Sequence, residues 1–293
     1  MSFLKSPRFM LIISMVIFGT LGPFVRNIPV TSGELALYRA VMALFLIGMF
    51  LLVSKQKINF SAIKKDLPLL LVSGAAMGIN WILLFEAYKY TTVSAATLSY
   101  YFAPVIVMIV CPLLFKEKMG FKQIVCFVMT CVGIVMITGV GNMSEGSSHI
   151  KGIAFGLGAA MFYASVILIN KFIKNVGGIH RTFLQFISAV IVLAPYVFVT
   201  SGVTFSGMNK TGWICLAFVG LIHTGIAYCF YFSALKGIPG QEAAILSYVD
   251  PLVAVIISVV VLGENMTLLQ ALGGILILGF TLWNEINPKR KTQ

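Results

Sequence analysis

Residues Lys236–Gln270, KGIPGQEAAILSYVDPLVAVIISVVVLGENMTLLQ, repeat the pattern of an earlier stretch of the chain without a gap. Phe85–Gln123 aligns with Phe232–Gln270 at a fixed offset of 147 residues. Ten of the 39 aligned pairs are identical: Phe85/Phe232, Ala87/Ala234, Lys89/Lys236, Ala96/Ala243, Tyr101/Tyr248, Pro104/Pro251, Ile109/Ile256, Glu117/Glu264, Met119/Met266 and Gln123/Gln270. Apolar composition does not explain a proline, a glutamate and a glutamine that recur in phase, so we infer two copies of one unit.

The composition of the 293-residue chain indicates a membrane protein. Hydrophobic residues make up 59% and charged residues 10%, which leaves too little polar surface for a soluble globule. The net charge of +12 does not indicate nucleic-acid binding, because basic residues occur singly or in short groups between apolar segments. The cysteines lie inside apolar runs, so we expect them to pack in the core or against lipid rather than to form disulfides or bind a metal. They are Cys111, Cys126, Cys131, Cys215 and Cys229.

Ten segments are long and apolar enough to cross a bilayer, which takes roughly 17 to 25 residues. We predict them at Phe9–Val25, Glu34–Val53, Leu67–Ala87, Val93–Phe115, Phe121–Val140, Ile150–Ile173, Thr182–Thr200, Gly212–Leu235, Ala243–Leu262 and Leu268–Trp283. The basic residues before the first segment resemble a signal peptide, but no small-residue cleavage site follows, so we expect a retained span. The connections are short and leave no soluble domain.

Lysine and arginine residues are distributed unequally between the two sides that these spans define. Sixteen fall on the side of both termini, and four fall on the other side: Arg26, Lys89, Lys151 and Lys210. Arg39 lies inside the second span and completes the 21. Because cytoplasmic loops carry the excess of positive charge, we predict that both termini are cytoplasmic.

Each copy of the repeat contains five spans, so the second copy must enter the membrane from the opposite side. The predicted fold is therefore an all-α polytopic membrane protein with two inverted five-helix repeats, at residues 1–145 and 146–293. Inverted repeats of this kind exchange conformations around a site near the bilayer midplane. This architecture is typical of secondary transporters.

Two prolines lie inside apolar spans at equivalent positions of the two copies. Pro104 and Pro251 each remove a backbone hydrogen bond, and the freed carbonyl is tolerated where it faces protein or a water-filled cavity. They form either a paired hinge or static kinks. Tyr101 and Tyr248, three residues earlier, either offer a ring and a hydroxyl to the cavity or pack in the core.

Charged and titratable residues inside the spans are the sharpest candidates for substrate binding. An unpaired Arg39 would cost roughly 2.5–3.5 kcal/mol in the membrane, so it either extends to the interface or binds a substrate carboxylate. Asp250 either accepts a proton, binds an ammonium group or stabilises the kink of the ninth span at Pro251. His223 is either a structural residue or a proton relay. Glu86 fits an interfacial position.

Further polar and aromatic residues are unfavourable on lipid-facing surfaces, so we expect some of them to line the cavity: Asn80, Trp81, Tyr163, Asn170 and Gln185. Glu117 and Glu264 end the fourth and ninth spans. We assign both to structural roles at the positive N-terminal ends of the helices that follow.

Features of other protein classes are missing from the sequence. It contains no Walker motif, no cluster of metal ligands and no nucleophile arrangement, so we expect neither an ATP-driven pump nor an enzyme, and no cofactor. Glycines at Gly152, Gly156, Gly273 and Gly274 indicate close helix packing rather than a phosphate loop.

At these residues the chain resembles the EamA family of the drug/metabolite transporter superfamily. The resemblance covers nearly the whole chain, with a proline in each fourth span, a glutamate closing it, and a glutamine and glycines in each fifth span. These residues are Pro104, Glu117, Gln123 and Gly133 in the first copy, and Pro251, Glu264, Gln270 and Gly274 in the second. The stretch FKEKMGFKQ departs from the Leu-Gly-Glu that is usual in the family. The resemblance implies a basket-shaped cavity and export of amino acids or other small metabolites from bacteria.

We therefore predict a secondary transporter of the bacterial cytoplasmic membrane that exports small metabolites, amino acids first, by alternating access. Arg39 would meet a carboxylate, Asp250 an ammonium group or a coupling proton, and the aromatic residues would form walls. An exporter of cationic drugs is the nearest alternative, and a lipid scramblase is a more distant one. The expected partners are a small-molecule substrate and the lipid bilayer, for a monomer or a homodimer.

Overall fold

A computed structural model describes residues 6–55, 60–115, 120–138, 146–176, 178–203, 207–235 and 246–285. The first half contains α1 (Pro7–Gly19), α2 (Leu21–Arg26), α3 (Ser32–Val53), α4 (Phe60–Tyr90), α5 (Val93–Tyr100), α6 (Ala103–Phe115) and α7 (Phe121–Thr138). The second half contains α8 (Gly146–Phe172), α9 (Gly178–Thr200), α10 (Lys210–Ala217), the π-helix η3 (Phe218–Ile226), α11 (Ala227–Leu235), α13 (Val249–Val260) and α14 (Leu268–Glu285). The described residues contain helices and no strands.

The described helices confirm the prediction of ten apolar segments. Six are long and apolar enough to cross a membrane, and four shorter apolar helices lie at the predicted fourth, fifth, ninth and tenth spans. Many large apolar side chains remain on the outer surface, for example Phe121 at 83% and Val199 at 86% exposure. Such a surface would be costly in water and is suited to contact with lipid.

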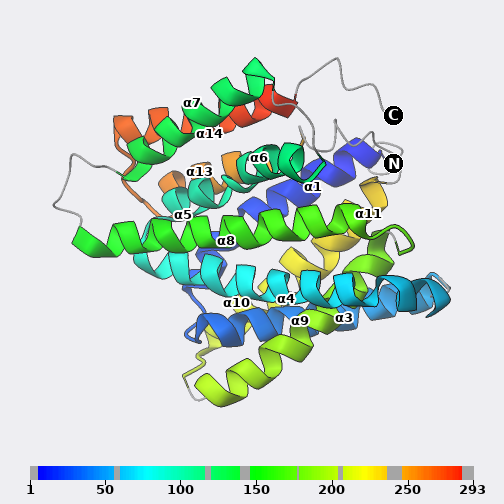
Figure 1. The fold of residues 1–293 in the computed structure, drawn as a ribbon. Coiled ribbons are helices and arrows are strands. Elements are labelled where there is room, and N and C mark those ends of the chain that lie inside the picture. The colour runs from blue at the N-terminus through cyan, green and yellow to red at the C-terminus, as the bar shows by residue number, and fades with distance from the viewer. Residues whose placement is uncertain are drawn as a thin grey trace.

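The two halves pack around each other as inverted repeats. In the first half α1 packs against α11 and α13, and in the second half α8 packs in the same way against α4 and α6. Figure 1 shows α1 beginning at the end marked N and α8 beginning at the opposite end of the molecule. The two copies therefore run in opposite directions, as expected. The exact boundary between residues 145 and 146 stays a prediction.

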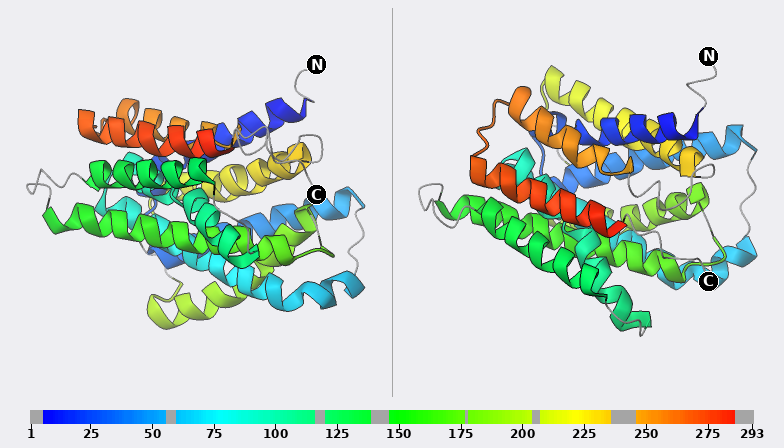
Figure 2. Two further views of the ribbon diagram at one scale, coloured as in Figure 1. Left: turned by 45° about the horizontal axis from the view of Figure 1, so that its top comes forward. Right: turned by 90° about the horizontal axis from the view of Figure 1, so that it is seen from above.

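Helices α7 and α14 lie along each other and complete one side of the bundle (Figure 2). Gly133 and Gly273 form a close contact between them. A Cβ atom on Gly133 would lie 2.7 Å from the carbonyl oxygen of Gly273, and one on Gly273 would lie 2.6 Å from that of Gly133. The two glycines therefore permit a backbone contact that any side chain would prevent.

The helix is interrupted inside three of the spans that we expected to be continuous. Thr20 separates α1 from α2, and Tyr101–Phe102 separates α5 from α6. In the ninth span, α13 begins directly after Tyr248. At Pro104 the expected kink is therefore a two-residue interruption between α5 and α6, and Pro251 follows a turn at Ser247 and Tyr248. The proline of each copy lies in the first turn of the helix that follows, where a missing backbone N–H leaves no hydrogen bond unmade.

Candidate functional site

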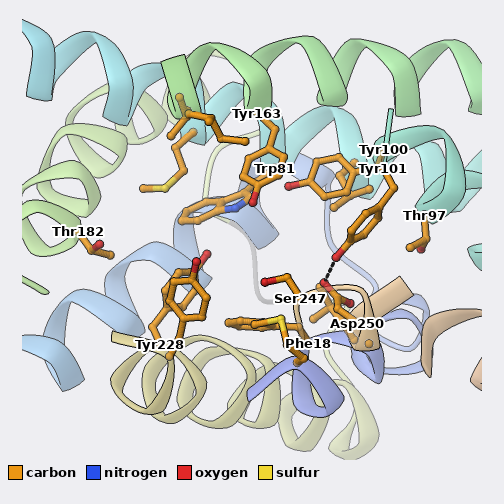
Figure 3. Close-up of a pocket in the computed structure, with 18 of the residues that line it drawn as sticks. Phe18, Trp81, Thr97, Tyr100, Tyr101, Tyr163, Thr182, Tyr228, Ser247 and Asp250 are labelled. Atoms are coloured by element: carbon orange, nitrogen blue, oxygen red, sulfur yellow. Dashed lines mark hydrogen bonds between the residues drawn. The ribbon is translucent and has the colours of Figure 1, made fainter. Parts of the chain in front are cut away.

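A cavity of about 600 Å³ lies between the two halves of the chain. Its lining comes from the early helices of both copies, including α1, α3, α4, α5, α8 and α9, and from α11 and α13 (Figure 3). The lining includes Gly178, which is exposed at the start of α9. The cavity therefore reaches the surface at the end of the molecule where α1 also begins.

Six of the nine candidate substrate-binding residues line this cavity. They are Arg39, Trp81, Tyr101, Tyr163, Gln185 and Asp250. The fold brings these side chains together from α3, α4, α8, α9, α13 and the turn between α5 and α6. The candidate site is therefore shared between the two halves.

Arg39 is a buried cation, with 4% of its surface exposed. Its Nε donates a hydrogen bond of 2.7 Å to Oγ1 of Thr224 in η3. Its Cζ lies 4.9 Å from the ring centre of Trp81 and 5.7 Å from that of Phe85, which are cation–π distances. No carboxylate of the described residues lies within ion-pairing distance of it. Snorkelling to the interface thus does not describe its position, and the part of the chain that the structure describes supplies no anionic partner for it.

Asp250 supplies the acidic group of the cavity. It lies in the first turn of α13, and its Oδ2 accepts a hydrogen bond of 2.7 Å from the hydroxyl of Tyr101 (Figure 3). The backbone of Asp250 packs directly on α1, where a Cβ atom on Gly19 would lie 2.6 Å from its carbonyl oxygen. One carboxylate of the second half is thus held by a tyrosine of the first half.

Aromatic rings form most of the remaining wall. The ring of Tyr100 stacks on that of Tyr163 with centroids 5.1 Å apart. Figure 3 shows Trp81 and Tyr163 on one side of the cavity, with Tyr228 and Phe18 on the other. These rings provide flat apolar surface beside Arg39 and Asp250, which is the usual composition of a small-molecule site.

Three of the expected cavity residues do not line the cavity, and two of these have clear contacts elsewhere. Asn80 is buried and donates a hydrogen bond of 2.6 Å to the carbonyl oxygen of Ala159, which ties α4 to α8. Nε2 of His223 lies 3.1 Å from Oγ1 of Thr20, the residue between α1 and α2. The ring of Tyr248 is buried 6.3 Å from that of Tyr101.

Glu117 and Glu264, which end the fourth and ninth spans, were expected at the N-terminal ends of the helices that follow them. Glu264 instead accepts hydrogen bonds of 2.9 and 3.2 Å from the backbone N–H of Val93 at the start of α5. It also accepts a hydrogen bond from Ser258 and forms an ion pair with Arg26. Its position at a helix N-terminus agrees with the electrostatic argument, but the helix belongs to the other repeat. Glu117 lies outside the described residues.

Sequence reasoning missed several cavity residues, among them Phe18, Thr97, Tyr100, Tyr228, Tyr231 and Ser247. The internal repeat contained a signal for some of them. The offset of 147 residues places Tyr228 at the position equivalent to Trp81, and Ser247 at that of Tyr100. Extending the register of the repeat beyond Phe85 would have identified Tyr228.

A second cavity, of about 430 Å³, lies beyond the first toward the opposite end of the molecule. Arg26, Ser32 and Lys89 contribute polar groups to it. Tyr88 borders both cavities, and its hydroxyl lies 3.4 Å from that of Thr97. Tyr88 therefore forms a partition between the two spaces. No group of three or more metal-ligating side chains occurs among the described residues.

Comparison with known proteins gives a family match over both halves. The model of the EamA-like transporter family matches residues 6–139 and 150–284. The chain is 31% identical over 268 residues to the uncharacterized transporter YxxF of Bacillus subtilis (strain 168), covering 91% of this chain and 85% of that protein. It is 26% identical over 269 residues to an uncharacterized transporter of Clostridium kluyveri, covering 88% and 86%. A solved crystal structure with 14% sequence identity matches 94% of this chain and 95% of its own with a TM-score of 0.65, which concerns the fold alone.

Proposed function

Because this chain belongs to the EamA-like transporter family, we propose that it exports amino acids or closely related zwitterions across the bacterial cytoplasmic membrane by alternating access. The observation that carries this proposal is that Arg39 and Asp250, of opposite charge, line one cavity. Arg181 also lines it, but its guanidinium donates hydrogen bonds to three backbone carbonyl oxygens. The guanidinium of Arg39 has no carboxylate partner among the described residues, and Asp250 contributes a carboxylate to the same 600 Å³ space. A substrate with one carboxylate and one ammonium group complements both.

The size and walls of the cavity support a substrate of this class. Ligand pockets of roughly 300–1,000 Å³ suit small molecules, and this cavity falls within that range. The aromatic rings around the charged pair favour an amphipathic side chain over a highly polar one. Because Arg39 belongs to the first half and Asp250 to the second, such a substrate would contact both repeats and favour states that bring them together.

The access route supports export from the side of the termini. The cavity reaches the surface near Gly178 and is closed toward the second cavity by the partition at Tyr88. We propose that the end with Gly178 faces the cytoplasm, which the excess of basic residues on the side of the termini supports. Substrate would then enter the cavity from the cytoplasm at the end with Gly178. It would leave on the other side of the membrane after the end with Gly178 closes and the partition at Tyr88 opens.

Counterflow in proteoliposomes tests the proposal. Liposomes containing the purified protein and one unlabelled amino acid are assayed for exchange with the labelled compound, across the twenty standard amino acids. We expect saturable exchange for a subset, reduced at least about tenfold by Arg39→Gln and by Asp250→Asn, since charge-assisted contacts contribute about 1.5–3 kcal/mol. Lys151→Gln and Glu86→Gln are the controls, because both residues lie outside the cavity lining. Exchange that is unaffected by either cavity variant contradicts the assignment.

The cationic-drug alternative rests on Asp250 and the aromatic walls. A site that binds a cationic substrate is expected to lack positively charged side chains, because like charges repel strongly at low dielectric constant. Arg39 lines the same space, which favours the zwitterion. A competition assay with tetraphenylphosphonium against the best amino acid separates the two. If the organic cation competes and Arg39→Gln strengthens its binding, the drug exporter is the better description. Repeating the assay with and without a proton gradient tests whether Asp250 also carries a coupling proton.

A further inference from the structure

The eighth span contains a π-helix, η3, that contacts Arg39 of α3 through Thr224. In η3 the hydrogen bonds of two side chains reach back five residues. Oγ1 of Thr224 donates 2.8 Å to the carbonyl oxygen of Val219, and Nδ1 of His223 lies 3.2 Å from that of Phe218. Such segments are rare, widen the helix and are found frequently at functional sites. Here the segment directs the Thr224 hydroxyl toward α3.

Close packing between η3 and α3 brings Thr224 to Arg39. Gly220 and Gly225 lie against Met42 and Leu46 of α3, and a Cβ atom on either glycine would collide with those side chains. Arg39 precedes Met42 by three residues and therefore lies on the same face of α3. The two glycines thus allow the backbone of η3 to approach the face that carries the arginine.

We propose that Thr224 is a positioning residue for Arg39, acting from the second repeat on the substrate-binding cation of the first. This inference rests on the function proposed above. The Thr224 hydroxyl accepts one N–H group, that of Nε. Among the described residues, the terminal nitrogens of the guanidinium make no hydrogen bond to protein. The bond at Nε fixes the plane of the guanidinium over Trp81 and leaves its terminal nitrogens for a carboxylate, which they can bind through two parallel hydrogen bonds.

The alternative is that Thr224 only satisfies its own backbone, as buried threonines in helices often do. Thr130 in α7 is such a case. It is fully buried, its hydroxyl donates 2.7 Å to the carbonyl oxygen of Cys126, and it does not line the cavity. Thr130→Val is therefore a matched control for Thr224→Val, because both remove a buried hydroxyl and keep the side-chain shape.

The fluorescence of Trp81 gives a readout that requires no substrate. The other tryptophans, Trp213 and Trp283, are 47% and 45% exposed on the outer surface, so a Trp213→Phe/Trp283→Phe background leaves Trp81 as the reporter. In this background Arg39→Gln defines the emission of an indole without the guanidinium. We expect Thr224→Val to shift the emission toward that reference, and Thr224→Ser and Thr130→Val to leave it at the starting value.

Binding of L-phenylalanine and of phenethylamine, its analogue without the carboxylate, forms the second arm of the test. These probes match the aromatic lining, and only the first offers an anion to Arg39. We expect Thr224→Val to weaken phenylalanine binding about tenfold and phenethylamine binding about twofold at most, with recovery in Thr224→Ser. If phenylalanine does not bind the starting protein, the proposed function fails for that substrate while the fluorescence still decides the role of Thr224. Emission of Thr224→Val equal to that of Thr130→Val would overturn the inference.

Discussion

Arg26 and Glu264 form an ion pair that joins the last turn of α2 to the segment between α13 and α14. Nη2 of Arg26 also donates 2.9 Å to the carbonyl oxygen of Thr91, and Glu264 accepts the N–H of Val93. The backbone N–H of Ser94 in turn donates 3.3 Å to Oγ of Ser258. This outer cluster, made of Arg26, Thr91, Val93, Ser94, Ser258 and Glu264, links the two repeats at the end where the central cavity is closed.

Breaking the outer cluster is expected to favour states that open at that end. Glu264→Gln removes the ion pair and weakens the hydrogen bond to Val93, so the closed arrangement loses about 1–2 kcal/mol and the open population rises about tenfold. The measurement is labelling of a cysteine introduced at Thr97, in a cysteine-free background, by a membrane-impermeant maleimide applied to intact cells.

Glu86→Gln is the control for this experiment. Glu86 accepts a hydrogen bond of 2.5 Å from Ser32 and pairs with Lys89 at 3.2 Å, and all three residues belong to the first repeat. Glu86→Gln therefore removes a negative charge at the same end of the molecule without breaking a link between the repeats. Equal labelling rates in the Glu264→Gln and Glu86→Gln proteins would show that the outer cluster does not hold this end closed.

The contact between α7 and α14 is expected to depend on the absence of side chains. Gly133→Ala places a methyl group 2.7 Å from the carbonyl oxygen of Gly273, so the two helices must separate. We expect a loss of about 1–3 kcal/mol, typical of overpacking, and a melting temperature lower by several degrees in detergent. Gly279→Ala, on the same pair of helices, meets no atom within 4 Å and is expected to leave the melting temperature equal or higher. A melting temperature that changes equally in both variants would contradict the packing argument.

Asn80 illustrates a polar residue that serves the fold rather than the substrate. Replacing it by alanine removes the buried hydrogen bond to the carbonyl oxygen of Ala159 that ties α4 to α8, which costs about 0.5–1.5 kcal/mol. We expect Asn80→Ala to lower the melting temperature while the KM for exchange stays within about twofold of the starting value. Asn27→Ala removes a similar bond, 2.8 Å to the carbonyl oxygen of Pro23, at an exposed site, and should change neither quantity. A KM raised tenfold at unchanged stability would return Asn80 to the substrate site.

The internal repeat made the architecture predictable, because a gapless offset of 147 residues divides the ten apolar segments into two copies of five, and an odd number of spans requires their inversion. The rotation of each helix about its axis was harder to predict. Asn80 and Trp81 are neighbours in α4, yet only Trp81 faces the cavity. In an apolar helix, a polar side chain satisfied by a distant carbonyl has the same local sequence as one that faces a substrate. The π-helix was not predicted either; its Gly220 and Gly225 lie against Met42 and Leu46 of α3, residues that are distant in the sequence. Arg39 and Asp250 were identifiable because a buried charge needs a partner.

Tyr101 and Tyr248 are equivalent in the repeat but differ in the structure, which allows a direct comparison. Tyr101 lines the cavity and its hydroxyl donates to Asp250, whereas Tyr248 does not line it. Removing the hydroxyl in Tyr101→Phe frees the Asp250 side chain to rotate and removes a hydrogen bond to a charged group, which contributes about 1.5–3 kcal/mol. We expect the KM of the best amino acid to rise about tenfold.

Tyr248→Phe makes the same chemical change at the equivalent position and should raise the KM by no more than about twofold. Because the two substitutions remove the same atom from the same residue type, a general loss of stability would affect both variants. The comparison therefore isolates the contact with Asp250. If the two variants raise the KM equally, the hydroxyl of Tyr101 does not orient Asp250 for the substrate, and the charge of Asp250 must act without it.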